Sequence, residues 1–350
     1  MRFLAAVLVI FSHAYPLTAH NGELFSKLSN GQWDLGSMAV AIFFTISGFL
    51  VTQSFDKSNN FWTFTKSRVL RIYPGLIAAT FFCAFVVGPI VTTLSMKDYL
   101  GDERTYEYLK VVFMFPMHWT LPGVFEDTFS FNNSINGSLW TIPYEILCYA
   151  IVAVIGIFGA LKRKEILLFL FVFSIYGRLF LRSYVPENIS WVYLPSLIDL
   201  FPFFASGMLV YSYRDKIPLN KWYALISLVL IITSIKFGGL IDVFTVCGGY
   251  LIFYLSYHNK IRFHNFGKRG DLSYGIYIYA FPVQQTVTYL WGAGIPVIAN
   301  ILISIPVVLG LAFLSWHFIE KPAMKLKNWS FKSKVTKEGS VVVSKAKTLQ

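Results

Sequence analysis

Apolar runs of about 20 residues, roughly ten in number, fill most of this sequence, and a run of this length is what a membrane-crossing helix needs. The runs are continuously apolar instead of alternating, so they predict helices and not the strands of a barrel. We therefore expect an all-α polytopic membrane protein with about ten transmembrane helices. The approximate limits of the runs are 3 to 19, 36 to 54, 74 to 94, 139 to 159, 165 to 183, 194 to 212, 221 to 237, 239 to 257, 272 to 291 and 295 to 317.

The composition excludes several other classes of protein. Of the 350 residues, 55% are hydrophobic and 14% are charged, which leaves too little polar surface for a soluble domain of this length. The net charge of +12 comes mostly from loop residues beside apolar runs, so it indicates membrane topology and no nucleic-acid partner. The three cysteines lack metal-ligand spacing, so no metal site is expected.

The distribution of positive charge predicts the orientation. If the N-terminus is cytoplasmic, about 23 of the 30 Lys and Arg residues fall on the inner side, as the positive-inside rule requires. Both termini are then cytoplasmic. Residues 1–320 are expected to form one transmembrane domain, and residues 321–350, which are polar and rich in lysine, a partly disordered cytoplasmic tail.

Three ionisable residues lie inside predicted helices, where a functional role is the default expectation. His13 lies about 16 Å along a helix from Arg2, near the middle of the bilayer, whereas Glu145 and Asp199 fall in outer halves. An imidazole can take a proton from an alcohol, and a carboxylate can stabilise the imidazolium, so a catalytic pairing of His13 with Glu145 is predicted. The alternative is a structural histidine that is hydrogen-bonded to Ser12 or to the helix backbone.

A group of cations lies at the predicted cytoplasmic ends of the first spans. Lys66, Arg68 and Arg71 precede one span, and Arg2 lies at the same membrane face. Four cations at one interface could bind a phosphorylated ligand, but charge alone favours ordinary positive-inside anchoring or contact with lipid headgroups.

A pair of small residues, Ser47 and Gly48, lies in the stretch "FFTISGFL" of the second predicted span. Small residues let a ligand or another helix approach closely. Both interpretations remain open for this pair.

Four stretches, in order along nearly the whole chain, carry a resemblance to a known family. They are Arg2 to His13 (R-x10-H), "IFFTISGFL" followed by "RVLRIYP", "SLWTIPYE", and "LSYGIYIYAFPV" with "FIEKP". With these stretches the sequence resembles the acyltransferase-3 family, the bacterial polysaccharide O-acyltransferases. Two positions depart from the family pattern: Ala41 stands where an acidic residue is common, and Ala280 where a histidine is common.

The resemblance implies transfer of an acyl group, usually acetyl, from cytoplasmic acetyl-CoA to a sugar hydroxyl of a surface polysaccharide or lipid-linked glycan. It places the enzyme in the bacterial inner membrane, with acetyl-CoA as a substrate and no permanently bound cofactor. O-antigen and exopolysaccharide units are the acceptors that it suggests.

The same resemblance assigns roles to residues of this chain. His13 would be the catalytic residue, as a general base or as a nucleophile that accepts the acyl group, with Arg2 its partner and Glu145 the family's glutamate. Arg68 and Arg71 would bind the donor. From the order of the spans we further expect the donor to pass beside Ser47 and Gly48, and the acceptor to approach from the outer half, lined by Glu145, Trp140, Tyr144 and Asp199.

Two rival functions also fit a chain with many spans. A transporter or flippase would carry polar groups near the midplane, but the halves of this chain show no convincing repeat, and many transporters are built from one. Binding of a lipid-linked glycan without chemistry is the other rival. Neither rival depends on acetyl-CoA.

Overall fold

The structure is a computed structural model that describes residues 1–20, 22–58, 60–126, 134–185, 194–257, 270–292 and 294–328. Apart from an isolated bridge between Thr92 and Val124, the described residues hold no β structure. A helix lies at each of the ten predicted runs. The main helices are α1 (Arg2–Leu17), α3 (Leu35–Ser58), α4 (Phe61–Phe82), α8 (Ile142–Ile157), α9 (Lys164–Tyr176), α10 (Leu194–Tyr213), α11 (Lys221–Phe237), α13 (Gly249–Tyr257), α14 (Ser273–Trp291) and α15 (Val297–Ser315).

Shorter elements extend or connect these helices. Several long helices contain a π-helical turn, which continues the helix with one looser turn. The π turns are η1 (Cys83–Val87), η5 (Gly177–Leu181), η7 (Phe244–Gly248) and η9 (Trp316–Glu320). The short α-helices are α2 (Leu24–Leu28), α5 (Gly88–Val91), α6 (Met96–Gly101), α7 (Glu103–Glu107), α12 (Leu240–Val243) and α16 (Lys321–Lys325). The 3-10 turns are η2 (Tyr108–Phe113), η3 (Gly137–Thr141), η4 (Ala160–Lys162), η6 (Arg182–Tyr184) and η10 (Leu326–Asn328).

Seven helical segments of the described chain are long and apolar enough to cross a membrane. The chain is thus an all-helical, multi-pass membrane protein. The first helix, α1, is apolar but shorter than these seven. The count of ten spans and the cytoplasmic position of the termini stay predictions. The seven segments are Leu35–Ser58, Phe61–Val91, Gly137–Ile157, Lys164–Tyr184, Leu194–Tyr213, Leu240–Tyr257 and Val297–Lys325.

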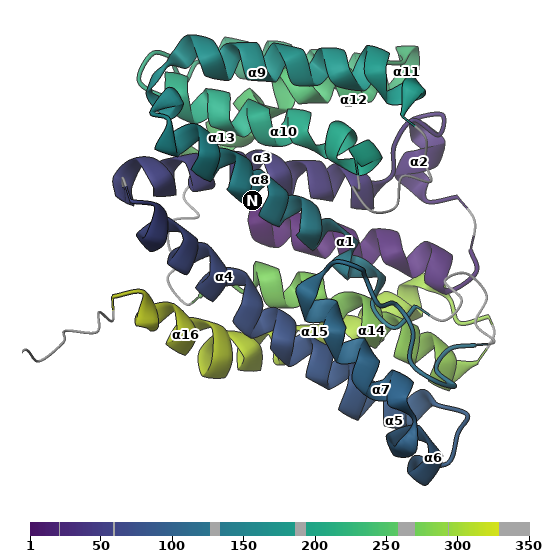
Figure 1. Cartoon of the computed structure of the whole chain (residues 1–350). Coiled ribbons are helices and arrows are strands. Elements are labelled where there is room, and N and C mark those ends of the chain that lie inside the picture. Colours follow the sequence, from purple (N-terminus) through teal and green to yellow (C-terminus); the bar gives the residue numbers. More distant parts are fainter. Residues whose placement is uncertain are drawn as a thin grey trace, which may run out of the picture.

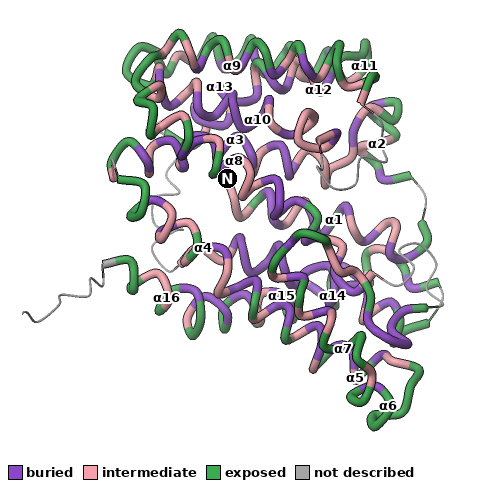
Figure 2. Tube along the Cα trace, viewed as in Figure 1, coloured by how far each residue is buried: buried purple, intermediate pink, exposed green. Residues whose placement is uncertain are grey.

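The helices α1 and α3 occupy the centre of the molecule (Figure 1). Helix α3 contacts α10 on one side and α1 on the other, while α14 packs against α1 and is followed by α15. Helix α9 lies against the far side of α10. Figure 2 shows the consequence for burial: buried residues are frequent along α3, whereas α9 and α11 at the rim carry few of them. The site candidates on α1 and α3 are therefore held by packed helices on both sides.

The crossing of α3 and α10 depends on two glycines. A Cβ atom on Gly48 would collide with the carbonyl oxygen of Phe204, and one on Gly207 would collide with that of Thr45. Helices pack this closely in a membrane only where small residues let the backbones meet. Gly48 therefore serves helix packing and faces α10, which accounts for it without a ligand.

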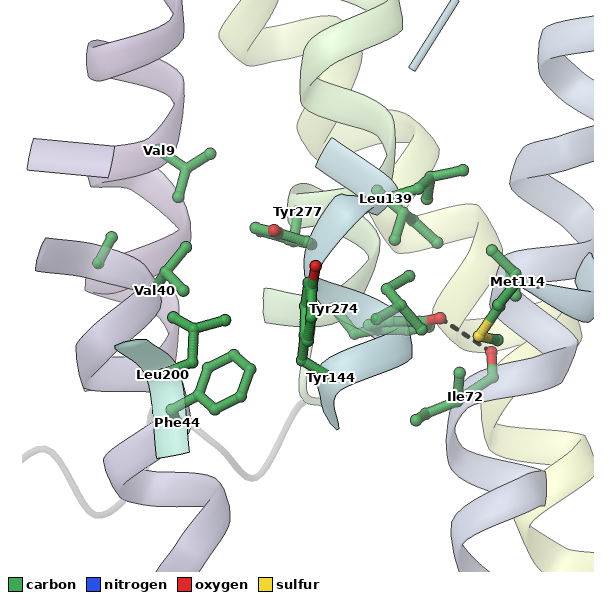
Figure 3. Packing of buried hydrophobic residues seen from close by; sticks show 14 of the residues in the cluster. Val9, Val40, Phe44, Ile72, Met114, Leu139, Tyr144, Leu200, Tyr274 and Tyr277 are labelled. Atoms are coloured by element: carbon green, nitrogen blue, oxygen red, sulfur yellow. Dashed lines mark hydrogen bonds between the residues drawn. The ribbon is translucent and has the colours of Figure 1, made fainter. Parts of the chain in front are cut away.

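Aromatic side chains of α14 fill the space between the central helices and α4. Figure 3 shows Tyr277 across from Val9 of α1 and Val40 of α3. The buried hydroxyl of Tyr274 donates a hydrogen bond to the carbonyl oxygen of Ile72 at 2.9 Å, which ties α14 to α4. A hydrogen bond of this kind is useful where no water can satisfy the hydroxyl.

The C-terminal helix extends past the domain boundary that was predicted at residue 320. Helix α15 continues through η9 and α16 into η10, so the chain stays helical to Asn328. Both α16 and η10 pack against α4. The rest of the predicted tail, residues 329–350, lies outside the described residues.

Candidate active site

A cavity with a volume of about 550 Å³ collects positive charge from several helices. We call it the cationic cavity. Its volume is in the range of small-molecule sites, and guanidinium and ammonium groups are the usual partners of phosphate. Its cations come from α1, α3, α4 and η10, and they are Arg2, Lys57, Arg68, Arg71 and Lys327.

Two of these arginines share one carboxylate. The Nη2 atom of Arg71 lies 2.6 Å from the Oδ2 atom of Asp271, and the Nη1 atom of Arg2 lies 3.6 Å from the same oxygen. Arg71 also lies 3.6 Å from the fully buried carboxylate of Glu320. Burial alone would raise the pKa of Asp271, but Arg2 and Arg71 outweigh it and lower the pKa to about 2. Asp271 therefore stays ionised and holds two like charges together.

Arg68 has a different environment from Arg71. Its guanidinium donates to the hydroxyl oxygens of Ser67 and Ser54 at 3.3 and 3.4 Å, and it lies 5.7 Å from the ring centre of Tyr149. No carboxylate of the described chain pairs with it. Arg68 is thus an oriented cation whose charge is not neutralised by an ion pair in that part of the chain.

A narrow cavity of about 30 Å³ adjoins the cationic cavity, since Arg2 and Ser47 line both. Glu145 lines the narrow cavity and accepts hydrogen bonds from Ser47 Oγ at 3.1 Å and from Tyr149 OH at 2.5 Å. These contacts group Glu145 with the residues predicted for the donor side. The residues that line a cavity with His13 do not include Glu145.

A third cavity, of about 110 Å³, holds His13. The imidazole is partly buried, and the ring of Phe281 lies edge-on with its centre at 5.3 Å. Its Nδ1 atom is buried and makes no hydrogen bond within the described chain. The Nδ1 atom of His13 therefore lacks the hydrogen bond to Ser12 or to the helix backbone that the structural alternative required. The other lining residues are Val9, Ser12, Asp34, Gly36, Ser37, Val40, Trp140 and Tyr277.

The carboxylate that lines the His13 cavity is Asp34, which was not among the residues predicted from the sequence. Asp34 precedes α3 and accepts hydrogen bonds from the backbone N–H and the hydroxyl of Ser37, both at 2.7 Å. Ser12 is placed to donate to Asp34 Oδ1 at 3.3 Å and to Glu23 Oε2 at 3.2 Å. Glu23 also accepts from the backbone N–H of Leu35. Asp34 is the cap of α3, and this fixes its carboxylate beside α1.

The fourth cavity, of about 430 Å³, is lined by aromatic and acidic side chains, and we call it the aromatic cavity. Trp140 lines it and meets the buried ring of Tyr144 edge-on at 5.8 Å. Asp199 lines it too, with its Oδ2 atom 3.0 Å from Arg182 Nε. Three of the predicted acceptor residues, Trp140, Tyr144 and Asp199, therefore lie in or beside one cavity, whereas the fourth, Glu145, lines the narrow cavity instead. It is also lined by Trp33, Asp34, Arg178, Phe203, Ser26, Ser37 and Ser196.

The four cavities form a series because neighbouring ones share lining residues. The narrow cavity and the His13 cavity share Val40 and Tyr277, and the His13 cavity and the aromatic cavity share Asp34 and Trp140. His13 thus lies between two cavities that are each large enough for a ligand. Within a multi-pass membrane protein, this arrangement defines a candidate site for group transfer between two substrates.

Comparison with known proteins identifies the family. The model of a family described as "Acyltransferase domain" matches residues 1–317, so the chain belongs to the acyltransferase-3 family and is an acyltransferase. The predicted resemblance is confirmed.

Two curated proteins are similar to this chain over most of their length. An "O-acetyl transferase" of Shigella phage Sf6 is 31% identical over 332 residues, which cover 91% of this chain and 93% of that protein. "Nodulation protein 10" of Rhizobium leguminosarum bv. viciae is 30% identical over 361 residues, covering 93% and 92%. No solved structure matches the chain.

Proposed function

We propose that this protein is an inner-membrane O-acetyltransferase that moves an acetyl group from acetyl-CoA to a sugar hydroxyl of a cell-surface glycan. The similarity to a protein named O-acetyl transferase supports the reaction. The observation that carries the proposal is the position of His13 between the cationic cavity and the aromatic cavity.

The donor binds from the cationic side in this proposal. The phosphates of acetyl-CoA contact the cations of the cationic cavity, whose charge complements them. The linear pantetheine arm passes Arg2 and Ser47 towards the narrow cavity, whose lining side chains move apart to admit it because about 30 Å³ is less than the arm occupies. The bulky nucleotide stays in the cationic cavity. The thioester then lies near His13.

The acceptor binds in the aromatic cavity. Tryptophan offers a large apolar face with a polar edge, which suits a sugar ring, since such a ring also has both C–H and hydroxyl surface. Trp140 lines this cavity and the His13 cavity alike, so a sugar stacked there presents a hydroxyl towards His13. Asp199 supplies a hydrogen-bond acceptor for a second hydroxyl.

The chemical step is a direct acyl transfer. His13 removes the proton from the sugar hydroxyl while the oxygen attacks the thioester carbonyl carbon. The tetrahedral intermediate collapses, its carbon–sulfur bond breaks, and the departing thiolate takes the proton from the imidazolium. Asp34 stabilises that imidazolium through its negative charge, the role first assigned to Glu145.

Transfer of label from radioactive acetyl-CoA to glycan tests the proposal. Membranes that contain the wild-type chain should label glycan, and His13→Ala should lower the rate by about 10²- to 10⁴-fold, the usual contribution of a general base. The variant should still insert in the membrane and bind CoA. Full activity of His13→Ala would contradict the catalytic assignment, and no label with folded wild-type protein and a range of acceptors would favour transport instead.

A further inference from the structure

The cations of the cationic cavity fall into two groups. Arg2 and Arg71 are neutralised by Asp271, with Glu320 as a second partner of Arg71. Arg68 has no carboxylate partner within the described chain. The part of the cavity around Arg2 and Arg71 is therefore close to neutral, and the excess positive charge of the cavity lies on its other cations.

Two lysines share the second group with Arg68. Lys57 lies near the end of α3, and Lys327 lies in η10, and neither forms an ion pair with a described carboxylate. Both are exposed residues that line the cavity. Three cations around one cavity repel each other, so the arrangement favours a ligand that carries several negative charges.

Lys327 reaches the cavity because the helical segment that continues from α15 runs along α4 as far as η10. The segment α16–η10 packs against α4, which also carries Arg68. Lys325, two residues earlier, is exposed as well but is not among the residues that line the cavity. The contribution of Lys327 thus depends on its position and not merely on the basic composition of this segment.

We propose that Lys57, Arg68 and Lys327 form a polyphosphate-binding site, and that the segment α16–η10 is therefore part of the donor site. The site takes a ligand with more than one phosphate group. The identity of this ligand rests on the proposed function: it is the 3′-phosphorylated ADP portion of acetyl-CoA. The neutralised Arg2 and Arg71 then lie towards the pantetheine arm. The basic segment after residue 320 then has a function beyond solvation of the chain end.

Direct binding of CoA to the full-length chain, purified into discs of neutral lipid, tests this site. Lys327→Ala should weaken CoA binding about fivefold, the size expected for an exposed charge contact. Lys325→Ala removes the same charge from the same segment and should leave binding unchanged. Dephospho-CoA, which lacks the 3′-phosphate, should bind the wild type less tightly than CoA and should be less affected by Lys327→Ala.

The outcomes separate this site from the proposed function. Equal CoA binding by the wild type and Lys327→Ala would overturn the site alone. No CoA binding by the folded wild type would overturn both the donor assignment and the site. A lipid headgroup is the other source of phosphate: if discs containing phosphatidylglycerol abolish CoA binding in the wild type but not in Lys327→Ala, the site binds lipid and the CoA assignment is wrong.

Discussion

The cationic cavity and the aromatic cavity differ in how far their charged side chains are paired with side chains of opposite charge. In the cationic cavity, cations from four separate elements outnumber the carboxylates that pair with them. In the aromatic cavity, Arg178 pairs with Asp242 and Asp199 pairs with Arg182, so that among its described charged lining residues Asp34 alone has no ion-pair partner. An excess of one charge attracts an anion over some distance, whereas paired charges leave stacking and hydrogen bonds as the main contacts. The first cavity is suited to a phosphorylated ligand and the second to a neutral polyol.

Asp34 lies where the two halves of the site meet, and after the removal of His13 its removal is expected to have the largest effect on rate. Asp34→Asn should lower the rate constant of transfer about 10- to 100-fold, since each loss of about 1.4 kcal/mol of transition-state stabilisation costs a factor of ten. The amide keeps an oxygen that can accept from Ser37, so α3 should still begin correctly. The measurement is the single-turnover rate with saturating donor.

Asp98→Asn is a matched control, because Asp98 is exposed in the first turn of α6, where its carboxylate accepts a hydrogen bond from the capping residue Ser95. Its rate should equal that of the wild type. A normal rate for Asp34→Asn would show that His13 needs no carboxylate partner at this position.

Trp140→Ala should affect the acceptor and not the donor. Loss of the stacking face is expected to raise the KM for the acceptor about tenfold, which corresponds to about 1.4 kcal/mol. The KM for acetyl-CoA should stay within about twofold of the wild type. Trp222→Ala, at an exposed position of α11, is the control. An equal rise in both KM values would mean that the two cavities do not divide the substrates.

Added salt should distinguish donor binding in the cationic cavity from acceptor binding in the aromatic cavity without any mutation. Raising sodium chloride from about 0.05 to about 0.5 M should raise the KM for acetyl-CoA several-fold, because salt screens exposed charges such as Lys57 and Lys327. The KM for a neutral acceptor should change little. Steady-state kinetics at several salt concentrations check this prediction. A KM for acetyl-CoA that does not change with salt concentration would contradict charge-driven binding.

Asp271 contributes to stability, and this is the smallest effect expected. Its folded pKa of about 2 lies below the ordinary value, so its contribution is present above about pH 4 and is lost as the pH falls through about 2. Because the side chain is 37% exposed, Asp271→Asn should cost only about 1 kcal/mol at pH 7. Thermal unfolding measures this cost. Asp102→Asn removes an exposed pair with Arg104 and should change the Tm less.

Hydropathy predicted the helices because it is a local property. A run of about 20 apolar residues has few alternatives to a helix in lipid, and the structure places a helix at each predicted run. The sequence did not predict that the last helix extends to Asn328. The lysines within residues 321–328 indicate a solvated tail as long as the packing of this segment against α4 is not known.

The partners of the site residues could not be predicted in the same way. Asp271 lies 200 residues from Arg71 in the chain, and no local pattern joins them. Asp34 did leave a signal, because an aspartate just before an apolar run is a typical helix cap. That signal predicts where α3 begins but not that its carboxylate lies beside His13. Gly48 gave a correct indication of close approach, although only the fold shows that the neighbour is α10.

The narrow cavity also bears on membrane integrity. A protein with openings on either side of its catalytic centre must not let ions leak across the membrane. The narrow cavity, which Arg2 and Tyr277 both line, offers only about 30 Å³ of space to water. Phe43 and Phe44 line it with apolar surface, so an ion would have to shed most of its hydration shell to pass. The constriction that guides a substrate arm thus also preserves the electrical insulation of the membrane.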